Sequence, residues 1–142
     1  MDFITDFPKY LGKDCIYVVV DRLTKFYHLF SVTSSFSAAQ VSDLFYKEIF
    51  VLHGLPKIIM SDRDGKFMSV FLQELFRLVG TQLTPSISYH PQTDGQTERV
   101  NKWLEGYLQN YVGEQQKAWT KWLHLGEFCS RGIYLLANIL SR

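Results

Sequence analysis

The chain has 142 residues, of which 46% are hydrophobic, 15% aromatic and 20% charged, and its 15 basic and 14 acidic residues leave a net charge of +1. This composition can bury a core, so it excludes a disordered tail and a collagen-like repeat. The near-zero charge means that any contact with nucleic acid has to come from a local patch. No apolar run approaches the roughly 20 residues of a membrane-spanning helix, so we expect no membrane partner.

Three short strands are expected first. Residues 2–4 look like the end of a strand, residues 15–20 are a β-branched apolar run, and residues 26–30 follow a turn as their antiparallel partner. The two cysteines, Cys15 and Cys129, form no CxxC pair. We therefore expect buried thiols rather than a disulfide framework or a zinc site.

Helices and strands alternate in the rest of the chain. A capping box at Ser37–Gln40 begins a helix that ends at His53–Pro56. Further elements are expected as a strand at 57–61, a helix around 72–79 closed by Gly80, a strand at 82–84 and a long amphipathic helix over 100–112. This order predicts an α/β fold with a mixed sheet, in which three antiparallel strands precede alternating helices and strands and helices flank the sheet.

A first polar segment follows the strand at 57–61. Asp62 stands where this apolar strand ends, and ligand sites of open α/β sheets gather at the carboxyl ends of strands. The alternative is that Asp62 or Asp64 only starts a turn, which aspartate favours for backbone reasons.

A second polar segment, residues 89–102, leads into the long helix. Helix capping by Thr93 or Asp94 explains part of it but not Glu98. Helical spacing puts Glu98, Asn101, Lys102 and Glu105 opposite the apolar stripe. A solvated face with a Glu98–Lys102 pair, worth about 0.3–0.5 kcal/mol, is the simpler alternative.

The two segments together suggest a metal site. Residues 63–97, which number 35, separate Asp62 from Glu98, and Asp2 lies on the first strand. Carboxylates that converge repel by about 4 kcal/mol per pair at 4 Å and an effective dielectric constant of 20. Such a cluster needs raised pKa values or bound divalent cations, and oxygen ligands without His or Cys favour Mg²⁺ or Mn²⁺.

These residues resemble the catalytic core of a retroviral-type integrase, in particular that of Ty3/gypsy-class LTR retrotransposon polyproteins. The matching stretches are residues 1–4, 18–25, 53–57, 61–64 and 89–101, in the family's order. The last stretch, YHPQTDGQTERVN, is highly specific. The resemblance extends from residue 1 to about residue 128, so we expect residues 1–128 to form an integrase catalytic core.

The resemblance implies an RNase H-like fold and a D,D-35-E triad. By position the catalytic and metal-binding residues are Asp2, Asp62 and Glu98, and Asp64 is excluded because it would give a spacing of 33. The implied activity is that of a polynucleotidyl transferase: DNA 3′-end processing and strand transfer with Mg²⁺ or Mn²⁺, and with two ions. The implied DNA-binding residues are Tyr89, Gln92, Asn101 and Lys102.

The match ends after Phe128. Residues 129–142 depart from the family pattern and are interpreted as a divergent C-terminal tail. The chain contains neither the family's zinc-binding His/Cys module nor its C-terminal module, so we interpret it as a truncated copy.

Two alternatives stay open beside the integrase hypothesis. One is a catalytically inactive nucleic-acid-binding or self-associating module with the same fold. The other is an RNase H-type nuclease, which the motif at 91–101 disfavours. By family analogy the expected partners are the element's DNA ends, target DNA and a second copy of the chain, and the expected location is the nucleus, although no basic localisation cluster is visible.

Overall fold

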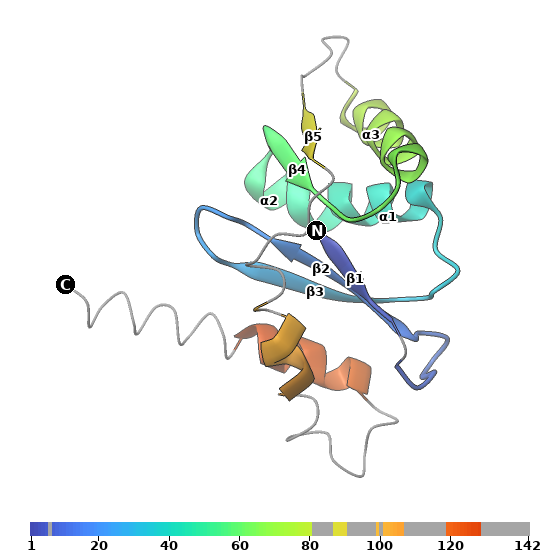
Figure 1. Ribbon diagram of the computed structural model, residues 1–142, viewed down its shortest axis with the longest axis vertical. Helices are drawn as coiled ribbons and strands as arrows, with labels where there is room; N and C mark the ends of the chain where they lie inside the picture. Colours follow the sequence, from blue (N-terminus) through green and yellow to red (C-terminus); the bar gives the residue numbers. More distant parts are fainter. Residues whose placement is uncertain (6, 81–86, 91–98, 100, 107–118, 129–142) are drawn as a thin grey trace, which may run out of the picture. The chain divides into compact units, whose positions relative to one another are not determined.

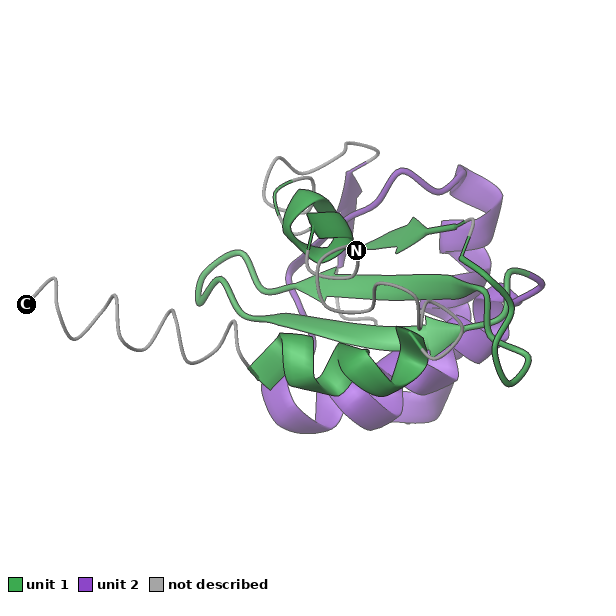
Figure 2. Ribbon diagram, turned by 90° about the horizontal axis from the view of Figure 1, so that it is seen from below, with its two compact units in different colours: residues 1–34, 95–142 green, residues 35–94 purple. Residues whose placement is uncertain are grey.

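A computed structural model of the chain describes residues 1–5, 7–80, 87–90, 99, 101–106 and 119–128 (Figure 1). The chain divides into two compact units, residues 1–34 with 95–142 and residues 35–94 (Figure 2). The tail at 129–142 lies outside the described residues, so its separation from a core at 1–128 stays a prediction.

The first unit is built on an antiparallel sheet. Its strands are β1 (Asp2–Ile4), β2 (Cys15–Val20) and β3 (Tyr27–Val32), in the order β1-β2-β3. These strands confirm the three that the sequence predicts, although β3 continues two residues further. The register pairs Asp2 with Val18 and Val18 with Leu29, so these three residues lie on one face of the sheet.

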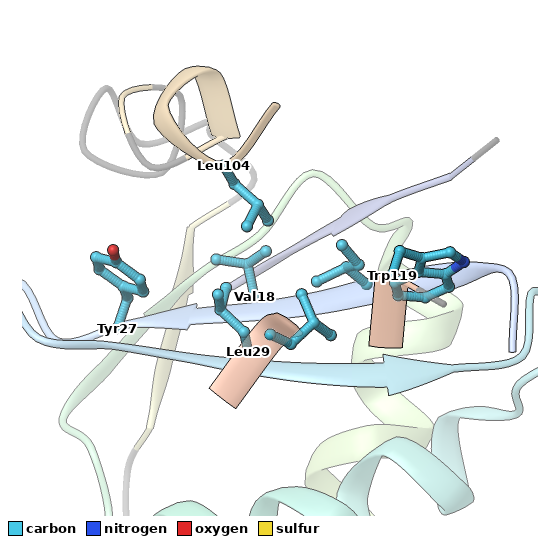
Figure 3. Close-up of a cluster of buried hydrophobic side chains, with 7 residues drawn as sticks. Val18, Tyr27, Leu29, Leu104 and Trp119 are labelled. Carbon is cyan, nitrogen blue, oxygen red and sulfur yellow. The ribbon is translucent and has the colours of Figure 1, made fainter. Parts of the chain in front are cut away.

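The core of the first unit covers that face. Sheet residues Ile16, Val18, Tyr27 and Leu29 pack with Leu104, Trp119 and Leu123 from the C-terminal part of the chain. Figure 3 shows Leu104 pointing from its helix toward Val18. The predicted long helix is confirmed over 101–106, and its remaining residues 107–112 lie outside the described part. A short 3₁₀ segment at 119–122 and a helix at 123–128 are additional elements that the sequence analysis did not predict.

The second unit begins with a helical run. The capping box that opens α1 (Ala38–Phe45) is confirmed: the Gln40 amide donates to Ser37 Oγ at 3.2 Å and the Ser37 amide to Gln40 Oε1 at 2.9 Å. A π-helical segment, η1 (Tyr46–Phe50), and a last turn, α2 (Val51–His53), follow. Gly54, with φ +74°, ends the run as predicted, because a glycine adopts this conformation without steric cost.

Two parallel strands flank a helix in the rest of this unit. They are β4 (Ile58–Met60) and β5 (Ser88–His90), and α3 (Gly65–Val79) lies between them in sequence and ends at the left-handed Gly80. The strand expected at 82–84 lies outside the described residues, and including residues 89 and 90 in a polar segment that leads into the long helix was wrong, because they belong to a strand. Pairing with β4 makes this segment a strand, and short-range patterns do not reveal a partner 30 residues away.

Antiparallel pairs in the first unit and a parallel pair in the second are the two kinds of pairing expected of a mixed α/β fold. Among the described helices none is long and apolar enough to cross a membrane.

Candidate functional site

Asp2, the first predicted carboxylate, is a buried residue on the edge strand β1, with 9% of its surface exposed. Its Oδ1 accepts a hydrogen bond from the Phe3 amide at 2.8 Å, and its Oδ2 accepts one from Asn101 Nδ2 at 3.2 Å. A buried carboxylate needs such donors, because leaving water without them is costly. Asp2 is thus fixed directly at both oxygens.

Asn101 lies beside Asp2 rather than on a solvated helix face. The expectation that it stands opposite the apolar stripe was wrong, because Asn101 is half-buried and bonded to the sheet, whereas Lys102 and Glu105 are exposed as expected. Residues three apart are neighbours on a helix, so Asn101 and the core residue Leu104 point the same way. The Asn101 Oδ1 atom is buried and has no hydrogen-bond partner within the described structure.

Asp62, the second predicted carboxylate, belongs to a loop at the carboxyl end of β4. We call Ser61–Asp64 the aspartate loop. The Asp62 side chain is exposed and receives no hydrogen bond from the described residues, whereas its neighbours are anchored. Ser61 is buried and its Oγ accepts the Arg63 amide at 3.3 Å, and Asp64 caps α3 by accepting the Phe67 amide at 2.8 Å.

Tyr89, a predicted DNA-binding residue, lies on β5 next to the aspartate loop. Its hydroxyl donates to the backbone carbonyl of Arg63 at 2.5 Å and lies 3.4 Å from that of Ser61. Burial raises the pKa of the Tyr89 hydroxyl above its usual value, and the negative charges of Asp62 and Asp64 raise this pKa further. The hydroxyl therefore stays protonated and remains a donor.

The other predicted site residues take no part in the contacts described above. Glu98 and Gln92 lie outside the described residues. Lys102 is exposed on helix 101–106. Within the described ranges no three His, Cys, Asp or Glu side chains gather in a way that could hold a metal ion.

The oxygen atoms near Asp2 fit a hard divalent cation. Each carboxylate oxygen of Asp2 accepts one of the hydrogen bonds given above, so both oxygens are held in place. The buried Asn101 Oδ1 lacks a donor, so it is a neutral oxygen still available to one. Carboxylate and amide oxygens are ligands of Mg²⁺ and Mn²⁺, so the residues present fit the expected metal.

Two arrangements near these residues escaped the sequence analysis. The Arg63 guanidinium lies over the rings of Phe36 and Phe67, at 4.8 and 5.4 Å from their centroids. In the first unit the buried His28 contacts Glu127, with 3.0 Å between Nδ1 and Oε1. A polar residue carries no sequence signal for a partner far along the chain, such as Glu127 for His28, 99 residues away, or Phe36 for Arg63.

No family model matches the chain. Over 125 residues, or 88% of its length, the chain is 34% identical to the Tf2-3 and Tf2-4 transposon polyproteins of Schizosaccharomyces pombe. The chain spans only 9% of the length of these curated relatives.

Comparison with solved structures identifies the fold. The HTLV-2 integrase catalytic core domain in complex with magnesium, in a dimeric form, superposes with a TM-score of 0.51 at 18% identity, over 85% of this chain and 81% of that one. Its trimeric form gives 0.50 at 22% identity, over 78% and 69%. Together with the transposon relatives, these matches confirm the resemblance and the RNase H-like fold that the motifs indicate.

Proposed function

We propose that this chain, a homologue of a segment of transposon polyproteins with the fold of an integrase catalytic core, acts in DNA integration as a polynucleotidyl transferase. The reactions are DNA 3′-end processing and strand transfer. The observation that carries the proposal is the hydrogen bond between Asp2 and Asn101, because it joins two residues that the integrase resemblance selects 99 positions apart in the sequence. The 34% identity to transposon polyproteins supports it independently.

Asp2, Asp62 and Glu98 are the proposed metal-binding carboxylates. Two Mg²⁺ or Mn²⁺ ions bound there would activate a water or a 3′-hydroxyl and stabilise the leaving oxygen of a phosphodiester. The magnesium complexes of the HTLV-2 core support this choice of metal. Asn101 holds the Asp2 carboxylate through its amide nitrogen, so that this carboxylate is oriented before any ion binds.

DNA is the proposed substrate. Lys102 is exposed and carries a charge suited to a phosphate, a contact that positions DNA without reading its sequence. Gln92 and Asn101 are the further proposed contacts near the DNA ends, and the integrase resemblance implies the same role for Tyr89. The HTLV-2 cores are described in dimeric and trimeric forms, which supports a proposal that this chain also self-associates. The nucleus is the proposed location, since target DNA lies there.

The test is strand joining on a branched DNA that mimics the integration product. The purified chain is incubated with Mn²⁺ or Mg²⁺, alongside Glu98→Gln. Glu105→Gln is the matched control, because it makes the same chemical change at an exposed position of helix 101–106. We expect joining by wild type and Glu105→Gln, loss of at least about 10³-fold in Glu98→Gln, and no joining in EDTA.

Other outcomes select the alternatives. If the folded wild-type chain binds DNA but joins no strands, the chain is an inactive nucleic-acid-binding module. If it cleaves the RNA strand of a hybrid instead, it is an RNase H-type nuclease. Joining that is indifferent to Glu98→Gln would remove Glu98 from the metal site.

A further inference from the structure

Asp62 is exposed in a loop whose other residues are held by contacts. Among the four residues of the aspartate loop, only Asp62 has a side chain that is exposed and makes no hydrogen bond to a described residue. Its orientation therefore depends on the backbone at Ser61 and Arg63. Whatever fixes these two peptide groups also fixes the Cα–Cβ bond from which the Asp62 carboxylate extends.

Tyr89 fixes both. Its hydroxyl has a single proton, which the Arg63 carbonyl accepts at 2.5 Å, and the Ser61 carbonyl lies at 3.4 Å as a weaker second acceptor. The two carbonyls belong to the residues on either side of Asp62. One side chain thus bridges the loop from the residue before the aspartate to the residue after it.

The strand register places Tyr89 where it can do this. β4 and β5 are parallel, with Ile59 opposite Tyr89 and Met60 opposite His90, and the Ser61 amide continues the ladder to the His90 carbonyl at 3.3 Å. The carboxyl ends of the two strands therefore coincide. A long side chain on β5 reaches the loop that leaves β4.

Arg63 is also held from its other end. Its guanidinium lies over the Phe36 and Phe67 rings, which themselves meet edge to face at 6.0 Å between centroids. With the carbonyl bound to Tyr89 and the side chain stacked on two rings, Arg63 has little rotational freedom. The loop is thus fixed on the side where it leads into α3.

We propose that Tyr89 is a positioning residue, whose hydroxyl clamps the aspartate loop and so presents the Asp62 carboxylate for metal binding. This inference rests on the proposed function, since it assigns Tyr89 a part in the same site. It differs from the role that the integrase resemblance implies, in which Tyr89 contacts DNA. A hydroxyl proton committed to the Arg63 carbonyl is not available to a phosphate oxygen.

The experiment compares wild type with Tyr89→Phe, which removes the hydroxyl and keeps the ring. Tyr46→Phe is the matched control, because Tyr46 lies in the same unit, stacks on Phe50 and makes no hydroxyl hydrogen bond within the described structure. Three quantities are measured: amide hydrogen exchange at residues 62–64 in metal-free protein, DNA affinity, and the strand-joining rate with saturating DNA.

For Tyr89→Phe we expect exchange in the loop to accelerate roughly fivefold to tenfold and strand joining to slow roughly tenfold, with DNA affinity changed by less than about twofold. Tyr46→Phe should alter none of the three. Weaker DNA binding with unchanged loop exchange would overturn the proposal in favour of a DNA contact, and unchanged exchange with unchanged joining would also overturn it. If wild type joins no strands, the proposed function fails, and the exchange measurement in metal-free protein still decides whether Tyr89 clamps the loop.

Discussion

The two units hold their predicted catalytic aspartates in opposite ways. In the first unit Asp2 is buried, and hydrogen bonds from the Phe3 amide and the Asn101 side chain fix its carboxylate directly. In the second unit Asp62 is exposed and contacts reach only its neighbours, through Ser61, Arg63 and Asp64.

The difference follows from the cost of burying charge. A carboxylate removed from water requires hydrogen-bond donors that compensate for the lost solvation. The same hydrogen bonds therefore hold the carboxylate in place and stabilise the fold. An exposed carboxylate costs little to keep charged, and contacts to the neighbouring backbone can set the position from which it extends. A substitution at Asp2 should therefore lower both stability and activity, whereas a substitution at Asp62 should lower activity alone.

The largest expected effect is a loss of activity on substitution of Asp62 but not of Asp64. Asp62→Asn should reduce strand joining by about 10³-fold or more, because a metal-binding carboxylate is lost, while stability changes by no more than about 0.5 kcal/mol at this exposed position. The control is Asp64→Asn, which keeps a side chain able to cap α3. It should retain activity and stability. A reversed pattern in strand-joining and urea-unfolding measurements would identify Asp64 as the catalytic residue.

A charge placed beside Asp2 should have the next largest effect. Asn101→Asp brings a second carboxylate to the position from which Nδ2 now donates to Asp2. At neutral pH in EDTA we expect a loss of about 2–4 kcal/mol in the free energy of unfolding, since two charges 4 Å apart repel by about that amount at an effective dielectric constant of 20.

Millimolar Mg²⁺ should restore part of this loss, measured by urea unfolding with and without the ion. Asn101→Ala is the control, because it removes the hydrogen bond without adding charge. It should lose less free energy of unfolding than Asn101→Asp, and its response to Mg²⁺ should not exceed that of wild type. Equal Mg²⁺ responses in the two variants would contradict a metal site at Asp2.

The smallest expected effect compares alanine at the two aspartates. Asp2→Ala leaves the Nδ2 group of the half-buried Asn101 without its acceptor, so the free energy of unfolding should fall by about 1–3 kcal/mol. Asp62→Ala removes an exposed side chain and should change it by less than about 0.5 kcal/mol. Urea unfolding midpoints of the two variants give the comparison, and equal losses would show that Asp62 is not held through its neighbours alone.

Local patterns predicted much of the fold. The run at Cys15–Val20, the capping box at Ser37 and the stop at Gly80 each depend on neighbouring residues, and all three are confirmed. β5 and the helix at 123–128 were not predicted, because each forms against a distant part of the chain: β5 pairs with β4, and Leu123 packs on the sheet. Burial against a distant element overrides short-range preference.

In the candidate site, too, some features were predicted from the sequence and others depend on distant contacts. The integrase resemblance selected Asp2, Asp62 and Asn101, and the structure adds that Asn101 bonds to Asp2, a contact across 99 residues. The bridge from Tyr89 to the Ser61 and Arg63 carbonyls depends on strand register, and backbone acceptors have no sequence signature. Sequence therefore indicates residue types at the site and leaves their partners open.

The arrangement of the units along the chain affects how the protein is made. The second unit is one continuous stretch, residues 35–94, while the first combines residues 1–34 with residues after 94. A ribosome therefore completes the apolar face of β2 and β3 long before it makes Leu104, Trp119 and Leu123, which cover that face. At 5–20 residues per second the delay is on the order of 5–20 s. During this interval the nascent sheet exposes apolar surface that chaperones can bind and that can aggregate.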